Sequence, residues 1–245
     1  MVQLLPTYRH LFEKDNRWCK QETEHFVFCY FKGSEAHKDI DSIKNIQETG
    51  FSNIIKTLKI RVPDKKIFYY FYPNKKIKKN LMGDDWYAQA VISEFCVHVL
   101  YTKKIKPTGP HEDVHLLTSG WGDSVGFFEE GLAEYFVGYA WDNRPHVFYV
   151  NEGVRKKYYL PIRRFFLHQT WLDTDDNLAI YFYSLAASFS KFLIENYGLD
   201  KYIKVYKKLK RQNTELKNLN IFRKNYSLDI DKMEKSFYLW ISEAK

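Results

Sequence analysis

The type of hydrophobic pattern changes along the chain, and this change most constrains the fold. The first hundred residues contain short runs rich in aromatic and β-branched residues, which are typical of strands. These runs are "EHFVFCYF" at 24–31, "KIFYYFYP" at 66–73 and "AVISEFCVHVLYT" at 90–102. The third run is long enough for one or two strands. After residue 126 apolar residues recur mainly at helical spacing. The sequence therefore predicts the α+β class, with a mixed sheet in the N-terminal part and helices in the C-terminal part.

Five segments have apolar residues at helical spacing: 34–58, 126–140, 178–198 and, near the C-terminus, 199–211 and 228–243. Ser34 is a good N-cap for the first helix, and Gly198 is placed to end the third. The apolar residues of the first helix are Ile40, Ile43, Ile46, Phe51, Ile54, Ile55 and Leu58. Those of the third are Phe182, Leu185, Phe189, Phe192 and Leu193.

These elements predict one domain, in which the C-terminal helices could form a helical subdomain. We expect an N-terminal segment at 1–23, the main domain at 24–211, and a helical extension of the same domain at 212–245. Hydrophobic residues make up 45% of the chain and aromatic residues 18%, with 19 tyrosines and 19 phenylalanines. A sequence with so many large rings can bury a sizeable core, which excludes wholesale disorder.

The net charge of +8 raises the question of an anionic partner. Lysines cluster in "NKKIKKN" at 74–80 and in "KYIKVYKKLKRQ" at 201–212. A nucleic acid or an anionic membrane surface would suit such clusters. No recognised nucleic-acid motif accompanies them, so a solvated lysine face is the favoured interpretation and no nucleic-acid partner is expected.

The cysteine count and the N-terminus bear on the compartment. An odd set of three cysteines, Cys19, Cys29 and Cys96, does not form a disulfide framework, although one Cys19–Cys29 bridge stays open. The N-terminus has no signal-peptide apolar region, and no stretch approaches about 18 continuous apolar residues. We therefore expect a cytoplasmic protein without a membrane segment. The alternative is a secreted protein whose leader has been removed.

The stretch "GPHEDVHLL" at 109–117 carries the strongest chemical signal. His111, Glu112 and His115 spell H-E-x-x-H, and residues four apart lie on one face of a helix. Two imidazoles so placed can bind one zinc ion at about 2.0–2.1 Å. Glu112 would then take a proton from the water at the open coordination position. Pro110 suits the first helical position, which places the motif at the start of its helix.

A third zinc ligand is offered fifteen positions after His115, in "FFEEGLAEYF". This string resembles the Glu-Gly-Leu-Ala-x-Tyr segment of small gluzincin-type zinc metallopeptidases, the peptidase-MA-like families. The resemblance implies a zincin-like domain in which Glu130, the residue before the glycine, is the third ligand. It also implies that Glu134, one turn further on, is a carboxylate that orients a ligating histidine.

The resemblance extends beyond the ligands. "YSLAASFSKFLIENYG" at 183–198 is similar to a downstream helix of the same families and nominates Tyr183 to stabilise an oxyanion. Tyr181 is the second candidate. The segment 95–102 falls where those families place the edge strand beside the substrate. The chain departs from the larger aminopeptidases in the short connection between His115 and Glu130, the loop "TSGWGDSVG" at 118–126.

Each candidate has a plainer interpretation. His111 and His115 would also suit a solvated helix face, and Glu112 would suit any helix N-terminus because of the macrodipole. Glu129 is a weaker ligand candidate than Glu130 because it points about 100° away around the helix. His98, in a strand, is expected to be structural or to line a cleft. The histidines without partners at metal spacing are His10, His25, His37, His146 and His168.

Taken together, the motifs predict a zinc-dependent hydrolase. The expected reaction is cleavage of a peptide or protein substrate by metal-activated water, with Glu112 as the general base. A catalytically inactive metallopeptidase-like binding protein is the alternative. A basic nucleic-acid binder is a third hypothesis, which rests on the net charge alone.

Overall fold

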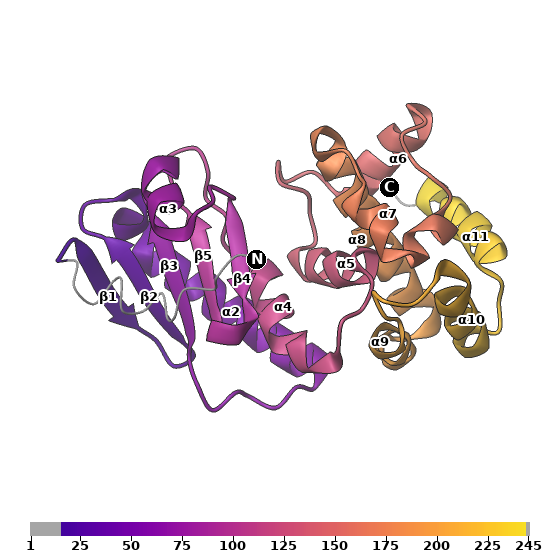
Figure 1. The fold of residues 1–245 in the computed structure, drawn as a ribbon, viewed down its shortest axis with the longest axis horizontal. Coiled ribbons are helices and arrows are strands. Elements are labelled where there is room, and N and C mark those ends of the chain that lie inside the picture. The colour runs from indigo at the N-terminus through magenta and orange to yellow at the C-terminus, as the bar shows by residue number, and fades with distance from the viewer. Residues whose placement is uncertain (1–15, 244–245) are drawn as a thin grey trace. The chain divides into compact units, whose positions relative to one another are not determined.

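The structure is a computed structural model that describes residues 16–243 (Figure 1). The chain forms two compact units, one ending at Leu117 and the other beginning at Thr118. The first contains a sheet and helices, whereas the second is helical, which confirms the α+β prediction. The predicted N-terminal segment, 1–23, lies largely outside the described residues. Its described part contains strand β1, Trp18–Glu22, which pairs with the sheet and which the hydrophobic pattern does not predict.

The sheet of the first unit has five strands in the order β1-β2-β3-β5-β4. The three central strands, β2 (Phe26–Phe31), β3 (Ile67–Tyr72) and β5 (Cys96–Leu100), run parallel to one another. Strand β1 and strand β4 (Ala88–Val91) are the antiparallel edges. All three predicted strand regions are confirmed, and 90–102 contributes to two strands.

The prediction of an edge strand at 95–102 is wrong. Strand β5 lies between β3 and β4, and its residues are buried. The chain reverses through a short 3-10 turn at Ile92–Glu94, so the preceding strand, β4, pairs outside β5 and becomes the edge. The sequence allows either one or two strands in 90–102. Because the structure has two, β4 and not β5 lies at the edge of the sheet.

Helices cover both faces of the sheet (Figure 1). Helix α3 (Lys75–Met82) packs its Ile77, Leu81 and Met82 against the face that carries Tyr70, Tyr72 and Cys96. Helix α2 (Glu35–Leu58) lies on the opposite face, where its Gln47 side chain bonds Tyr69. Because successive side chains of a strand point to opposite faces of the sheet, Tyr69 faces α2 and Tyr70 faces α3.

Helix α2 confirms the predicted Ser34 cap, whose hydroxyl accepts a hydrogen bond from the backbone N–H of His37 at 3.2 Å. One position of its predicted apolar stripe is wrong. Ile46 is 40% exposed, whereas its neighbour Gln47 is fully buried. The buried positions 40, 43, 47, 51, 54 and 58 form a regular helical stripe, so a polar side chain occupies one place in the core-facing row.

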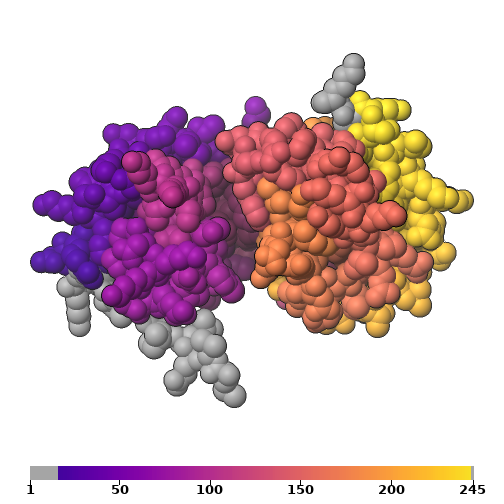
Figure 2. Space-filling view, turned by 90° about the horizontal axis from the view of Figure 1, so that it is seen from above, coloured from indigo at the N-terminus to yellow at the C-terminus, as the bar shows by residue number. Residues whose placement is uncertain are grey.

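The second unit is built around helix α8 (Ala179–Tyr197), which packs most extensively on α5 (Gly126–Val137), α6 (His146–Arg155) and α9 (Leu199–Lys208). The remaining helices are α7 (His168–Leu172), α10 (Glu215–Tyr226) and α11 (Ile230–Glu243). The residues of α11 form part of the outer surface, in yellow in Figure 2. The helices predicted at 126–140, 178–198, 199–211 and 228–243 are confirmed, whereas α3, α6, α7 and α10 are not predicted.

Gly198 ends α8 as expected, with a positive φ of 89° and its N–H donating to the carbonyl of Ile194 at 3.0 Å. The segment Asp176–Tyr197 is long and apolar enough to cross a membrane by length and composition, but 56% of its most apolar window is buried inside the structure. A core helix of a soluble protein meets the same two criteria. Cys19, Cys29 and Cys96 are all free thiols.

Candidate metal centre

The H-E-x-x-H motif lies at the start of helix α4 (His111–Thr118), as predicted. The two residues before it are held by α2. Gly109, at φ 111°, donates its N–H to the side-chain oxygen of Gln47, and its carbonyl accepts from the Gln47 amide at 3.2 Å. Pro110 packs against Gly50, where an added Cβ would come within 3.3 Å of the proline ring. Helix α4 therefore begins at a point fixed by the core of the first unit.

The buried side of α4 is anchored by Asp113, which is fully buried. Its carboxylate accepts from the Tyr69 hydroxyl at 2.7 Å and from the Gln47 amide at 3.0 Å. Burial raises the pKa of Asp113 well above its ordinary value, and the hydrogen bond from Tyr69 opposes this effect. Burial, followed by the neighbouring Asp113 charge, likewise raises the pKa of Tyr69. The contacts among Gln47 of α2, Tyr69 of β3 and Asp113 of α4 thus prevent α4 from rotating about its axis.

This anchoring leaves His111, Glu112 and His115 on the half-buried side of α4. The Nε2 atoms of His111 and His115 lie 3.2 Å apart, with ring centroids at 5.0 Å. Two nitrogens bound to one tetrahedral zinc ion at about 2.0–2.1 Å would be separated by about 3.3 Å. Within the part of the chain that the structure describes, no hydrogen bond or ion pair holds the Glu112 side chain.

Helix α5 carries the predicted carboxylate ligand, Glu130, which is half-buried. Its neighbour Glu129 faces another way and forms an ion pair with Arg211. Arg211 also donates to the carbonyl of Ser124 at 3.2 Å, so this contact ties the start of α5 to the segment after α9. Glu129 is thereby committed to a structural ion pair, which agrees with the choice of Glu130 as the ligand candidate.

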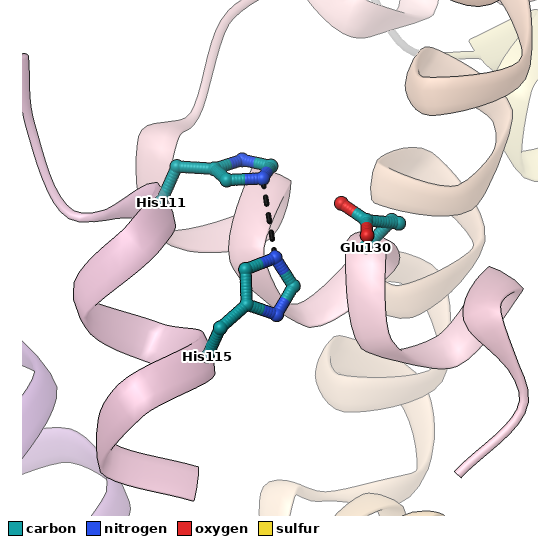
Figure 3. A group of neighbouring side chains, drawn as sticks. All are labelled: His111, His115 and Glu130. Carbon is teal, nitrogen blue, oxygen red and sulfur yellow. Dashed lines mark hydrogen bonds between the residues drawn. The ribbon is translucent and has the colours of Figure 1, made fainter. Parts of the chain in front are cut away.

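One potential ligand atom from each of His111, His115 and Glu130 lies within 4.8 Å of the other two. Figure 3 shows the two rings of α4 and the Glu130 carboxylate directed toward one another. Within residues 16–243, no other group of three His, Cys, Asp or Glu side chains is brought together in this way. Two imidazoles and one carboxylate, all half-buried, are a donor set that zinc commonly takes, so the residues fit the ion that the motif implies.

Glu134, predicted to orient a ligating histidine, lies one turn after Glu130 on α5 and is only 2% exposed. Its Oε2 lies 3.5 Å from Nε2 of His146, the first residue of α6. The other ring nitrogen of His146, Nδ1, lies 3.1 Å from the hydroxyl of Ser184 on α8. In the sequence, His146 has no partner at metal spacing, so the sequence does not predict a role for it. No local signal would have linked it to Glu134.

The two tyrosine candidates occupy different surroundings on α8. The half-buried Tyr183 packs its ring between Trp141 and Trp171, at 5.6 and 5.3 Å between ring centroids. The hydroxyl of Tyr181 accepts a hydrogen bond from the Lys156 ammonium at 2.9 Å. An oxyanion role for Tyr183 stays a prediction.

The remaining histidines that the structure describes have structural surroundings. His98 is fully buried on β5, with its Nδ1 2.7 Å from the Tyr72 hydroxyl. Burial, followed by the charge of Lys78, lowers the pKa of His98 to about 3, so the ring is neutral at physiological pH. His168 accepts the N–H of Gly126 at 3.0 Å and caps α5. The structural interpretation of His98 is therefore confirmed, and His10 lies outside the described residues.

The chain was compared with protein-family models and with curated protein sequences. No protein-family model and no curated protein sequence matches the chain. A metal centre is therefore indicated by the residues of α4 and α5 and by the distances between their side chains.

Proposed function

We propose that the protein is a zinc-dependent hydrolase, specifically a peptidase of the gluzincin type with a zincin-like domain. His111, His115 and Glu130 would bind the ion. The observation that carries the proposal is the approach of these three side chains, with 3.2 Å between the two imidazole nitrogens and all three ligand atoms within 4.8 Å. A general base, Glu112, stands next to the first of them in the same helix.

A bound zinc ion would act as a Lewis acid on the scissile carbonyl and on water. Glu112 would take a proton from the attacking water onto a carboxylate oxygen and pass it to the leaving amine. Its side chain is suited to this role because no described hydrogen bond or ion pair holds it elsewhere. Glu112 lies in the first turn of α4, next to the first candidate ligand.

The frame around α4 supports the same proposal. A general base and two ligands act together only if their helix does not rotate, because small misplacements cost large factors in rate. Asp113 points to the core while His111, Glu112 and His115 stay on the half-buried side. A helix that had no function would not need a fully buried carboxylate to fix its rotation, since an apolar residue can be buried there at a lower cost in free energy.

The experiment compares wild type, Glu112→Gln and the exposed control Glu24→Gln. Each is loaded with zinc and assayed on a library of quenched fluorescent peptides, with and without the chelator 1,10-phenanthroline. We expect Glu112→Gln to keep the ion and lose hydrolysis by about 10²–10⁴-fold, the usual contribution of a general base. Glu24, 84% exposed at its side chain, should be replaceable without effect.

Two outcomes would count against the proposal in different ways. Full activity in zinc-loaded Glu112→Gln would remove Glu112 as the base. A wild-type protein that binds zinc fully but cleaves no peptide in the library would instead support the alternative, a metallopeptidase-like binding protein without catalysis.

A further inference from the structure

The structure separates the two lysine clusters of the sequence by what surrounds them. In the cluster at 201–212, every large apolar side chain is at least partly buried. The cluster at 74–80 is followed by two large rings that remain in water, since Trp86 is 63% exposed and Tyr87 is 57% exposed. A simple solvated lysine face does not account for this second arrangement.

Helix α3 divides its lysines between two sides. Its inner side packs on the sheet, and Lys78 is fully buried there. Lys75, Lys76 and Lys79 are exposed on the outer side, because positions three and four apart share a face of a helix. Lys75 forms an ion pair with Asp85 at 3.6 Å. In the described part of the chain, no carboxylate forms an ion pair with Lys76 or Lys79, so their charges are uncompensated.

The segment that carries Trp86 and Tyr87 is fixed to the core of the first unit. Asp84 forms an ion pair with the buried Lys78 ammonium and accepts the backbone N–H of Trp86 at 3.1 Å. The carbonyl of Tyr87 accepts the N–H of Leu100, on the buried strand β5, at 2.8 Å. A buried ion pair contributes little net stability, because taking both charges out of water is costly. Its effect here is on conformation, since it fixes the backbone from which the two rings project.

The exposed rings and the outer lysines of α3 form one surface. The Lys75 ammonium lies 5.6 Å from the centroid of the Tyr87 ring, within the range of a cation–π interaction. A ring that stays mostly in water contributes little to folding, whereas fixed and exposed aromatic rings are typical of binding surfaces. We call this surface the α3 patch, and its members are Lys75, Lys76, Lys79, Trp86 and Tyr87.

The chemistry of the α3 patch favours one class of partner. Tryptophan and tyrosine are enriched at the boundary between lipid headgroups and acyl chains, because their rings are apolar and carry one polar group. Lysines beside such rings attract anionic headgroups. Nucleic-acid sites favour arginine, whose planar fork binds phosphate and stacks on rings, and the α3 patch contains lysines only. The combination therefore favours an anionic lipid surface over a nucleic acid.

We propose that the protein binds anionic lipid membranes at their surface through the α3 patch. Lys76 and Lys79 lie against the headgroups, and the rings of Trp86 and Tyr87 enter the interface below them. No part of the chain crosses the membrane in this arrangement. The inference goes beyond the proposed hydrolase and involves neither the candidate ligands nor zinc.

The test measures co-sedimentation of the full chain with lipid vesicles, either an equal mixture of phosphatidylcholine and phosphatidylserine or phosphatidylcholine alone. We expect binding to the mixed vesicles only, and weaker binding at high salt because salt screens the attraction. The double variant Lys76→Glu/Lys79→Glu should bind about 20-fold more weakly or worse, since each lysine near an anionic surface contributes about fivefold. The matched control is Lys232→Glu/Lys235→Glu, which makes the same charge change at the same spacing on the exposed side of α11 and should have a much smaller effect.

A second pair of variants tests the rings. Trp86→Ala should weaken binding to the mixed vesicles by about 10-fold, because the large apolar side chain no longer leaves water. Trp141→Ala is the matched control, since Trp141 is 62% exposed in the second unit, and it should bind like wild type. Urea unfolding of all variants checks that the fold is kept, which we expect because the replaced side chains are exposed.

Three outcomes would overturn the inference. Wild type would not bind the mixed vesicles, the two charge-reversal variants would be weakened equally, or Trp86→Ala would bind as well as Trp141→Ala. Equal weakening would mean that binding follows net charge alone. A labelled single-stranded oligonucleotide is tested in parallel, and binding to it without binding to vesicles would make a nucleic acid the partner instead. Because no measurement depends on zinc, this inference and the proposed function can fail separately.

Discussion

The backbone of Gly131 lies directly against the carbonyl group of Ala186. A Cβ added to Gly131 would come within 2.6 Å of that oxygen and 2.4 Å of the Ser190 hydroxyl. Helix α5 can therefore approach α8 this closely only because the residue after Glu130 has no side chain. The glycine of the "EEGLAEY" string thus has a packing role of its own.

We predict that Gly131→Ala destabilises the protein by about 1–3 kcal/mol, because the extra methyl group forces α5 away from α8. Gly120→Ala is the matched control, since nothing lies within 4 Å of a Cβ built there. Urea denaturation of the two variants would measure the difference. Equal free energies of unfolding would show that the helices separate without cost.

The network below α4 should be sensitive to a change of one atom. Asp113→Asn would replace a carboxylate oxygen by an NH₂ group, which would face one of the two donors, the Tyr69 hydroxyl or the Gln47 amide. A buried donor without an acceptor costs about 1–3 kcal/mol. Thermal or urea unfolding should show this loss, whereas Asp64→Asn, 87% exposed at its side chain, should change stability by less than about 0.5 kcal/mol. An Asp113→Asn variant as stable as wild type would refute the anchoring role.

His98 should make stability depend on pH. Its pKa of about 3 in the fold lies below the value of about 6.5 in the unfolded chain. The unfolded state therefore binds more protons between these values, so stability is fully present above about pH 6.5 and falls as the pH is lowered toward 3. The expected slope is about 1.4 kcal/mol per pH unit. Denaturation at pH 7, 6 and 5 should show a shallower decline in His98→Gln than in wild type, and parallel declines would contradict the account.

Zinc should stabilise the folded protein by mass action. At a free zinc concentration of 100 times Kd, the expected gain is about 2.7 kcal/mol. His115→Ala should abolish the gain, whereas His37→Ala, on α2, should keep it. Differential scanning calorimetry with and without zinc measures the effect, and an equal gain in both variants would place the ion elsewhere.

Much of the fold could be predicted because local patterns decide it. The strands around 24–31 and 66–73 and the helices α2 and α8 follow from runs and periodicities that are complete within the segment. The distinction between Ile46 and Gln47 could not be predicted, because the buried place of Gln47 depends on Tyr69 and Asp113, distant in sequence. The order of β4 and β5 depends likewise on a reversal at Ile92–Glu94 that the apolar run obscures.

The candidate site divides in the same way. His111, Glu112 and His115 could be nominated because residues one helical turn apart lie on one face of a helix. Glu130 could be nominated only through the resemblance of "EEGLAEY" to the peptidase segment. The approach of His146 to Glu134 could not be predicted, because it exists only after α5, α6 and α8 have packed together. Helices α6 and α10 were missed for a related reason, since their apolar residues become recognisable as a buried face only against α8 and α9.

The most direct test of the central claim is the zinc content of purified protein, measured for wild type, His111→Ala, His115→Ala and Glu130→Gln after dialysis against a dilute zinc buffer. Glu129→Gln is the matched control, because it removes the neighbouring carboxylate that pairs with Arg211. We predict about one zinc ion per chain in wild type and in Glu129→Gln, and a large loss in the other three. Zinc retained at the wild-type level by all three ligand variants, or no zinc in wild type, would contradict the account.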